Sequence, residues 1–504
     1  MTVLGIDVGT GGTRAVVVDD AGLVVASAAE PHEPFASPRP GWAEQDPDDW
    51  WRACTGAVRA ALERAPRHAV AAVGLSGQMH GAVVLDEREQ VMGPSLIWCD
   101  QRTEAECRTI TELVGEERLI QLTGNPALTA FTLPKLMWIR EHEPQIWRRV
   151  RAVLLPKDYV RLRLTGERAT DVADASGTLL FDVANRRWSA PMLDAVELDE
   201  RMLPLAYESP EVSGEITAAG AEATGLAPGT PVVAGAGDQA AGAVGMGVVR
   251  PGAVSATIGT SGVVFAATDR PARDPLGRIH TFCHAVPGRW HVMGVTQAAG
   301  LSLSWFVDRF GGDYQSATEL AASAPPGSGG VLWAPYLLGE RTPHLDPDAR
   351  GALVGLTATH GRAHVVRAIL EGVAFSLRDT LTIFDEMSIP VDSIRLGGGG
   401  ARSHIWRQIQ ADVYGQEVEV PRADEGAAYG AAILAGVGAR VWPSVDAACD
   451  SLVRIAARVA PDAEAAALLD GRYEAFRRLY GALKQAEIPA QSGEKDAERR
   501  PKRA

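Results

Sequence analysis

The sequence predicts an α/β protein with more than one domain. At 504 residues the chain is too long for a single hydrophobic core, because such cores stop growing near ~250–300 residues. Apolar strand-like runs alternate with helical patterns, which favours α/β layers over an all-helical or sandwich fold. A glycine-rich turn between two apolar runs also occurs twice, about half the chain apart. This repetition indicates two similar halves.

In the first half we expect strands in residues 3–27, arranged as a hairpin sheet. A helix follows near 48–64, because Asp46-Pro47-Asp48-Asp49 places acidic residues in its first turn. Three further strands are predicted at Val70–Leu75, Ala82–Leu85 and Ser95–Trp98.

The second half repeats this style. We expect a hairpin at 253–267, helices near 297–310 and 362–386, a strand at Ser393–Leu396, an amphipathic helix ending at Tyr414, and a strand at Glu417–Val420. Glycines cluster at 240–252, which predicts a domain joint there and domains at 1–246 and 247–486. Residues 487–504 are charged and lack periodicity, so we expect a disordered tail.

The composition excludes several classes of protein. A net charge of −14 argues against nucleic acid or anionic membranes as partners. Five scattered cysteines do not suggest a disulfide framework. Neither a signal peptide nor an apolar run of membrane-spanning length is visible. We therefore expect a cytoplasmic protein without membrane or nucleic-acid partners; a homodimer is left open.

The repeated turn is suited to holding phosphate. Residues 3–15 read VLGIDVGTGGTRA and residues 253–264 read AVSATIGTSGVV. Glycine lets the backbone approach an anion closely, and threonine adds a hydroxyl donor. Aligning the two turns places Asp7 opposite Thr257, so only the first copy carries a carboxylate. This pattern suits a nucleotide held between two halves, with the metal on one side.

Common nucleotide-binding motifs are missing from the sequence. None of the five lysines follows a glycine, so there is no Gly-Lys-Ser/Thr phosphate loop. The His-Arg-Asp catalytic loop of protein kinases is also absent. If the chain handles ATP, it does so with another architecture.

Three charged residues are candidates for the chemistry. Asp7 could hold Mg²⁺ through water, although it could also stabilise the turn. Arg14 could neutralise the charge of a transferred phosphate, or could be a surface strand residue. Asp238 ends an apolar strand at a glycine-rich corner, where it could act as the base in phosphoryl transfer or cap the next helix.

Other polar residues are candidates for ligand contacts. Gln78-Met79-His80 supplies an amide, a thioether and an imidazole, which suits a polyol, although a single histidine is often structural. Asp100 and Arg102, at the end of another strand, could serve the same pocket. Gly397–Gly400 lies between a strand and a helix, a setting that places a helix N-terminus beside an anion or adenosine.

These motifs together resemble those of the FGGY carbohydrate kinases, within the sugar kinase–actin–chaperone superfamily, and most closely the xylulokinases. The resemblance covers about residues 3–482. Besides the two turns, it rests on GWAEQDPDDWW (41–51), GLSGQMHGA (74–82), LIWCDQR (96–102), LPKLMW (133–138), LLPKDYVRLRLTG (154–166), AGAGDQAAGAVG (234–245), GERTPH (339–344) and LGGGGARS (396–403).

The resemblance implies two actin-like, ribonuclease H-like domains around a central cleft. It also implies an ATP- and Mg²⁺-dependent enzyme that phosphorylates D-xylulose at the 5-hydroxyl. Asp238 matches the family's general base, and Asp7 its metal-site acid, here expected to bind through water. The expected sugar contacts are Gln78, Met79, His80, Asp238, Gln239, Asp100 and Arg102, and the expected ATP contacts are Gly9, Thr10, Gly11, Thr13, Arg14, Gly259, Thr260, Gly398, Gly399 and Ala401.

Two alternatives remain at this stage. One is an FGGY kinase for another ketose or polyol, such as ribulose or deoxy-xylulose; the Gln78-Met79-His80 sequence differs from the Gln-Arg-Glu of the glycerol-kinase branch. The other is a non-catalytic ATP-binding sensor, against which Asp238 argues, because a pure binder needs no base there. The Gly11-Gly12 pair departs from the hydroxyl-bearing loop usual in the family and removes a donor.

Overall fold

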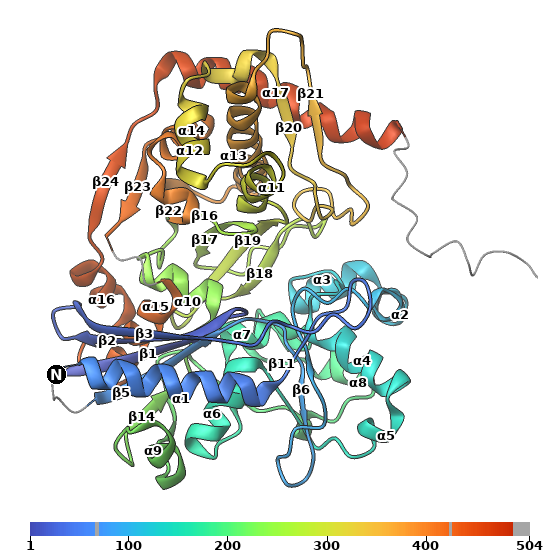
Figure 1. Ribbon diagram of the computed structural model, residues 1–504. Helices are drawn as coiled ribbons and strands as arrows, with labels where there is room; N and C mark the ends of the chain where they lie inside the picture. The colour runs from blue at the N-terminus through green and yellow to red at the C-terminus, as the bar shows by residue number, and fades with distance from the viewer. Residues whose placement is uncertain (66–69, 423–425, 487–504) are drawn as a thin grey trace, which may run out of the picture.

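Two β-sheets organise the chain, one in each half (Figure 1). The computed structural model describes residues 1–65, 70–422 and 426–486. The spatial order of the first sheet is β13 (Val212–Glu215), β14 (Pro231–Val233), β5 (Val70–Gly77), β1 (Thr2–Val8), β2 (Gly12–Asp19) and β3 (Val24–Pro31), with β15 (Ala236–Gly237) also paired to β5.

The second sheet repeats the central arrangement of the first. Its order is β18 (His280–Cys283), β19 (Trp290–Thr296), β17 (Gly262–Thr268), β16 (Gly252–Ile258), β22 (Val391–Gly398), β23 (Val418–Pro421) and β24 (Ile455–Val459). β1 pairs antiparallel with β2 and parallel with β5, and β16 pairs in the same two ways with β17 and β22. The predicted two-domain α/β fold with repeated hairpins is confirmed.

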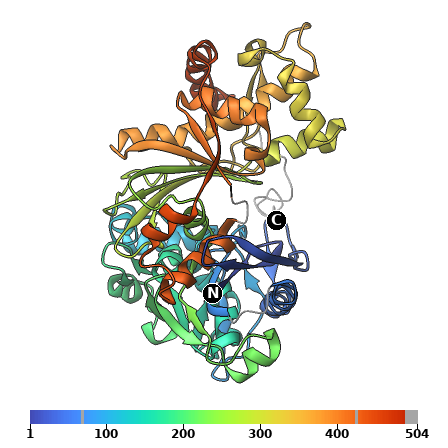
Figure 2. The ribbon, with the colours of Figure 1, turned by 90° about the vertical axis from the view of Figure 1, so that its left-hand side faces the viewer.

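Helices cover both faces of the first sheet. On one face, α1 (Pro47–Arg64) buries an apolar stripe that includes Trp50 and Val58. On the other lies α15 (Gly426–Gly438), from late in the chain, and Figures 1 and 2 show it in orange-red beside the blue strands. A Cβ on Gly5 would lie 2.0 Å from the Ala428 carbonyl oxygen, so glycine permits this close approach.

The predicted second domain, 247–486, therefore includes a segment that packs on the first sheet. Like α15, α16 (Val445–Leu452) contributes buried residues to a core shared with β1 and β2. The chain then returns to the second sheet through β24 and ends, within its described part, in α17 (Ala463–Gln485). The boundary itself stays a prediction.

The second sheet is covered by helices on one face and by the first half of the chain on the other. α11 (Gly300–Phe310), α13 (Arg362–Glu386) and α14 (His404–Tyr414) supply the core on the first of these faces. On the opposite face, Phe282 and Val295 share an apolar cluster with Met79 and Phe131 of the N-terminal half. The two halves thus meet through a packed core.

The remaining elements are short or lie at the edges. The helices are α2 (Glu104–Val114), α3 (Glu116–Thr123), α4 (Thr132–His142), α5 (Pro144–Trp147), α6 (Pro156–Thr165), α7 (Val172–Ala175), α8 (Ala190–Ala195), α9 (Ala218–Thr224), α10 (Asp238–Gly245) and α12 (Tyr314–Ala322). The remaining strands pair in separate two-stranded sheets and are β4 (Glu44–Gln45), β6 (Val83–Leu85), β7 (Ser95–Leu96), β8 (Ala152–Leu154), β9 (Ala169–Asp171), β10 (Phe181–Asp182), β11 (Arg187–Trp188), β12 (Leu205–Tyr207), β20 (Leu332–Ala334) and β21 (Ala352–Val354).

Most of the predicted elements are present, with small shifts at their ends. The helix expected near 48–64 begins at Pro47, and the one expected from 297 begins at Gly300. The strand expected at Ser95–Trp98 is only two residues long, because the chain turns at Ile97 into a loop. The predicted tail, 487–504, lies outside the described residues. No helix in the described ranges combines the length and apolar character needed to cross a bilayer.

Candidate active site

Two carboxylates occupy neighbouring strand ends of the first sheet. Asp7 in β1 pairs with Ser76 of β5. On the other side of β5, Ala236 pairs with the same Ser76, and Asp238 begins α10 two residues later. The strand register therefore brings the predicted base and the predicted metal-site acid to the same edge of the sheet.

The two carboxylates influence each other's protonation. Burial, and then the negative charge of Asp7, raise the pKa of Asp238 to about 7, against hydrogen bonds from Gln239 that lower it. Burial also raises the pKa of Asp7, and the Ser76 side chain and then the positive charge of Arg14 partly offset that rise. The Oδ1 atom of Asp7 is buried and accepts no hydrogen bond in the described part of the chain. An unpartnered carboxylate oxygen near a second carboxylate fits a divalent cation.

Met79 lies against the segment that carries Asp238, and His80 lies against Gly177. A Cβ on Gly237 would lie 2.8 Å from Cγ of Met79, so only glycine allows this contact. A Cβ on Gly177 would lie 2.6 Å from the His80 ring in the same way. Gly237 directly precedes Asp238, so the predicted sugar contact Met79 lies beside the predicted base, and His80 follows Met79 in the chain.

The conformation and tautomer of His80 are fixed by its neighbours. Its backbone has φ of 69°, and its carbonyl accepts hydrogen bonds from Thr132 and from Lys135, whose Nζ is 3.0 Å away. Nδ1 lies 2.7 Å from the Gly177 carbonyl oxygen, so it must carry the proton. Burial, followed by the charge of Lys135, holds the pKa of His80 well below its ordinary value. The neutral ring therefore offers Nε2 as an acceptor.

Gln78 takes part in an internal network. Its Oε1 accepts a hydrogen bond from the Thr10 hydroxyl at 3.1 Å, and its Nε2 donates to Oε1 of Gln45 at 2.8 Å. The Thr10 hydroxyl also accepts from Nε1 of Trp98 at 2.9 Å. Gln78 is predicted to contact the sugar and Thr10 the phosphate. In the structure their side chains form hydrogen bonds with each other and with neighbouring residues.

Asp100 and Arg102 form a buried pair. Asp100 accepts hydrogen bonds from the Arg102 guanidinium, the closest at 2.7 Å, and from the Ala43 backbone. The guanidinium also pairs with Glu44 at 2.8 Å and lies 3.6 Å from the centre of the Trp42 ring. These contacts use the polar atoms of the pair internally, so their predicted role in sugar binding has no direct support from the geometry.

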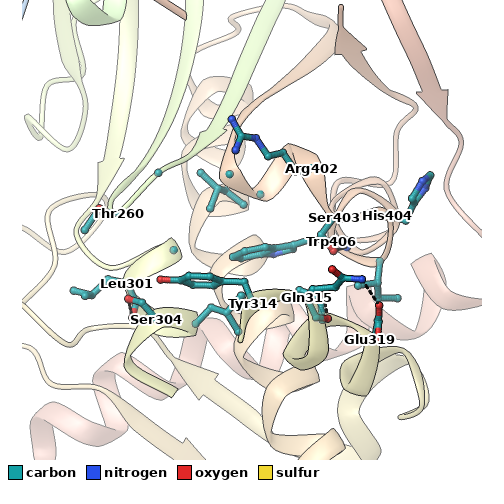
Figure 3. A pocket seen from close by; sticks show the side chains of 18 of the residues that line it. Thr260, Leu301, Ser304, Tyr314, Gln315, Glu319, Arg402, Ser403, His404 and Trp406 are labelled. Atoms are coloured by element: carbon teal, nitrogen blue, oxygen red, sulfur yellow. Dashed lines mark hydrogen bonds between the residues drawn. The ribbon is translucent and has the colours of Figure 1, made fainter. Parts of the chain in front are cut away.

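The second hairpin opens onto a cavity of about 790 Å³ (Figure 3). Gly259 and Thr260 at the tip of the hairpin line it, together with Gly399 after β22. The N-terminus of α11 is tied to the hairpin, because the Gly300 amide donates to the Gly259 carbonyl at 2.8 Å. This cavity lies where the sequence predicts nucleotide contacts.

For the other predicted ATP contacts, the structure shows contacts within the protein. Gly398 has φ of +71°, and a Cβ there would lie 2.4 Å from the Ile258 carbonyl oxygen, so this glycine supports the hairpin. Ala401 is buried, and its carbonyl accepts a hydrogen bond from Arg407. The Thr13 hydroxyl lies 2.9 Å from Nε2 of His32. In the first hairpin, the Gly9 amide donates to the Gly12 carbonyl, and Gly11 and Arg14 lie beside this turn.

The cavity also has a wall that sequence reasoning missed. It comes from α12 and α14, and Figure 3 shows Tyr314 and Trp406 projecting into the space, with Gln315 hydrogen-bonded to Glu319. The signal for α12 was present, because Asp313 and Ser316 form a capping box at its start. A short helix with few apolar residues nevertheless gives a weak periodic pattern.

The geometry separates two chemical environments. One holds two carboxylates, a thioether and a neutral imidazole, which can bind a polyhydroxy compound and accept its proton. The other is a roomy cavity with a glycine turn and aromatic side chains, which can hold a nucleotide. Phosphoryl transfer needs both, and the hairpins repeat the same anion-binding backbone beside each.

Comparisons with known proteins show which family the chain is similar to, and the family models match it in two parts. The models of the N-terminal and C-terminal domains of the FGGY family of carbohydrate kinases match residues 2–245 and 254–439. The chain is 42% identical over 482 residues to the xylulose kinase of Escherichia coli K12, covering 95% of this chain and 99% of the relative. A second relative, the xylulose kinase of Bacillus subtilis 168, is 35% identical and covers 98% and 99% of the two chains.

A solved structure is similar to this chain over nearly its full length. The crystal structure of xylulose kinase from Rhodospirillum rubrum superposes with a TM-score of 0.89 and is 32% identical, covering 96% of this chain and 99% of that one. The similarity extends through both halves, so no large part of the described fold lacks a counterpart.

Proposed function

This chain belongs to the FGGY family of carbohydrate kinases, and from that premise we propose that it transfers the γ-phosphoryl group of ATP to the 5-hydroxyl of D-xylulose. The observation that carries the proposal is the contact of Met79 with Gly237, immediately before Asp238. It joins the predicted ketose contacts to the predicted base. The naming of the full-length relatives above as xylulose kinases supports the choice of sugar.

In this proposal Asp238 accepts the proton of the 5-hydroxyl as that oxygen attacks the phosphorus. A pKa of about 7 leaves a large fraction of the carboxyl ionised at neutral pH while keeping it basic enough to accept the proton. His80 accepts a hydrogen bond from a sugar hydroxyl at Nε2, and Met79 supplies an apolar wall. The backbone turns at Gly9 and Gly259 orient the phosphates.

Asp7 is the residue that fits Mg²⁺, because its buried Oδ1 has no hydrogen-bond partner in the described residues. When bound, Mg²⁺ supplies positive charge that neutralises the phosphate oxygens. Asp7 holds it through water in this proposal, which agrees with the few protein ligands that Mg²⁺ requires.

A kinase assay on purified protein tests the substrate. We expect the highest kcat/KM for D-xylulose, a lower value for D-ribulose and 1-deoxy-D-xylulose, and almost no activity with glycerol. A higher kcat/KM for ribulose or glycerol would overturn the sugar and leave the kinase activity intact. Absence of phosphorylation across the whole panel would instead favour the ATP-binding sensor.

His80→Ala tests the sugar contact within the same assay. Removing the acceptor leaves a sugar hydroxyl unpaired, which costs about 1–3 kcal/mol and raises KM for the sugar by roughly 5- to 150-fold. KM for ATP should change little. Met79→Ala is the matched comparison, because it removes an apolar wall without a hydrogen bond and should relax discrimination between sugars. A rise in KM for ATP alone would remove His80 from the sugar site.

A further inference from the structure

The GERTPH segment (339–344) of the C-terminal half has no role in the reaction described so far. Its backbone is fastened to the end of β19: the Thr342 amide donates to the Val295 carbonyl at 3.0 Å, and the Val295 amide donates to the Thr342 hydroxyl at 3.0 Å. Val295 shares its apolar cluster with Met79 and Phe131. The segment is therefore held at the point where the C-terminal half meets the predicted sugar contacts.

Glu340 stabilises the backbone of this segment. Its negative charge acts on the Arg341 guanidinium, but the two side chains form neither a hydrogen bond nor a close ion pair in the described residues. Its carboxylate accepts hydrogen bonds from the Arg341 amide at 2.8 Å, from the Gln297 amide at 2.9 Å and from the Thr296 hydroxyl. These donors occupy both oxygens of the buried carboxylate. The guanidinium of Arg341 forms neither a hydrogen bond nor an ion pair with any residue in the described part of the chain.

The charge of this guanidinium acts on histidines of both halves. The His80 ring packs edge-on against Phe131 with centroids 5.0 Å apart, and Phe131 packs in the same way against His280 of β18 at 5.5 Å. The positive charge of Arg341 contributes to lowering the pKa of His80, after burial and Lys135. It also contributes to the lowered pKa of His280, after burial. The charge thus acts across the boundary between the halves.

The other charged groups facing this region are already occupied. The ammonium of Lys135 donates to the carbonyls of His80 and Ala130. The carboxylate of Asp100 accepts from Arg102 and from the Ala43 backbone. Cys99 interacts electrostatically with Arg341, but burial raises the pKa of its thiol, which keeps it neutral. A partly buried guanidinium with five unused donors remains.

We propose that Arg341 donates hydrogen bonds to the ketose from the C-terminal half, at the end of the sugar that His80 contacts from the N-terminal half. Nε2 of His80 only accepts and a guanidinium only donates, so a hydroxyl group between them can satisfy both. A ketose carbonyl oxygen, which only accepts, suits the second N–H of the planar fork. This assignment rests on the proposed function and deepens it, because it makes the sugar a bridge between the halves.

Arg341→Gln is the test, with Arg341→Lys as the conservative variant and Arg350→Gln as the control. Arg350 lies nine residues further along the chain, and in the described residues its guanidinium bonds only to local backbone carbonyls and to Asp348. The measurements are the dissociation constants of D-xylulose and of its phosphorylated product by calorimetry without nucleotide, KM for both substrates, and the melting temperature.

We expect Arg341→Gln to weaken D-xylulose binding and to raise its KM by about 10- to 150-fold, the usual effect of losing hydrogen bonds from a charged donor. Arg341→Lys should fall between Gln and wild type, since it retains one cationic donor. KM for ATP and the melting temperature should stay near the wild-type values, as they should in full for Arg350→Gln. A change in the binding and KM of D-xylulose alone would indicate a sugar contact. A purely structural role would instead lower the melting temperature and raise KM for both substrates.

Three outcomes would overturn the inference: an unchanged dissociation constant for D-xylulose, a loss confined to ATP, or a loss confined to the phosphorylated product. The last would assign the arginine to the phosphoryl group. If Arg341→Gln does not fold, Arg341→Lys decides the matter by the same constants. A wild-type enzyme that fails to phosphorylate D-xylulose would contradict the proposed function, whereas an active wild type with an unaffected variant would contradict only the role of Arg341.

Discussion

The two hairpins have the same strand pairing but different neighbours. In the N-terminal half, Asp7 pairs with Ser76 of the parallel strand. In the C-terminal half, Thr257 pairs with Gly397 at the equivalent position. From this register the residues after β5, Gln78 to His80, correspond to Gly399, Gly400 and Ala401 after β22. One backbone frame thus carries bulky polar side chains in the first half and almost none in the second.

This difference agrees with the cavity found at the second hairpin. Gln78 fills the space beside the first turn and bonds the Thr10 hydroxyl. Gly399, at the corresponding place, leaves room and lines the 790 Å³ cavity with Thr260. The Thr260 side chain is exposed and its hydroxyl has no hydrogen-bond partner in the described residues. Duplicated anion-binding turns can therefore divide their work through the side chains of the adjacent strand.

Replacing Asp238 should lower kcat more than the other substitutions, because the proposed base lies in the N-terminal half and the C-terminal half does not duplicate it. Asp238→Ala should lower kcat by about 10²- to 10⁴-fold, the usual contribution of general acid–base catalysis. Binding of both substrates should be largely retained, since the nucleotide cavity lies in the other half. Asp238→Asn keeps the shape and should be equally impaired. A variant that keeps more than about a tenth of the wild-type kcat would refute the role of Asp238.

Asp7 tests whether the metal belongs to the first hairpin. A water-mediated metal contact is usually worth about 10- to 100-fold in metal affinity, so Asp7→Asn should raise the Mg²⁺ requirement by that factor.

The proposed base, Asp238, works when its carboxyl group is ionised, so activity is lost as the pH falls through its pKa. Because burial and Asp7 place the pKa of Asp238 at about 7, the acidic limb of kcat/KM should lie near pH 7 when Mg²⁺ is scarce.

Saturating Mg²⁺ at Asp7 should lower that pKa and move the acidic limb to lower pH, because it adds positive charge beside Asp238. Asp7→Asn should start from a lower limb, having lost the negative charge, and should show little further shift with Mg²⁺. Initial rates across pH at two Mg²⁺ concentrations measure both effects. An equal Mg²⁺-dependent shift in both proteins would place the metal elsewhere.

Much of the fold could be predicted because its signals are local. The alternating pattern of the hairpins and the long amphipathic helix, found at its predicted bounds Arg362–Glu386, depend on neighbouring residues in the sequence. The packing of α15 on β1 and β5 could not be predicted in the same way. It depends on close approach of small residues more than 350 positions apart, such as Gly74 and Ala431, whose carbonyl would lie 2.0 Å from a Cβ at Gly74.

For the candidate site, too, local motifs predicted some features, whereas others appeared only in the folded structure. Motifs placed Asp7, Asp238, Met79 and His80 on strand ends that the sheet then brings together. Motifs could not show that the Thr10 hydroxyl bonds Trp98, or that Asp100 binds Arg102, because such pairings depend on side-chain geometry after folding. The roles assigned to these residues stay predictions until the variants are measured.

The smallest expected effects come from the two equivalent threonines, and they compare the hairpins directly. Thr260→Val removes an exposed hydroxyl from the nucleotide cavity, so KM for ATP should rise about 10-fold, as for a lost hydrogen bond to a charged group. Stability should be unchanged. Thr10→Val instead leaves Oε1 of Gln78 and Nε1 of Trp98 without their partner, which costs about 1–3 kcal/mol of folding stability. Its melting temperature should fall while KM for ATP changes less than in Thr260→Val. Thermal unfolding and ATP titrations on both variants give the comparison, and equal KM values for ATP would show that the first turn also binds phosphate through its hydroxyl.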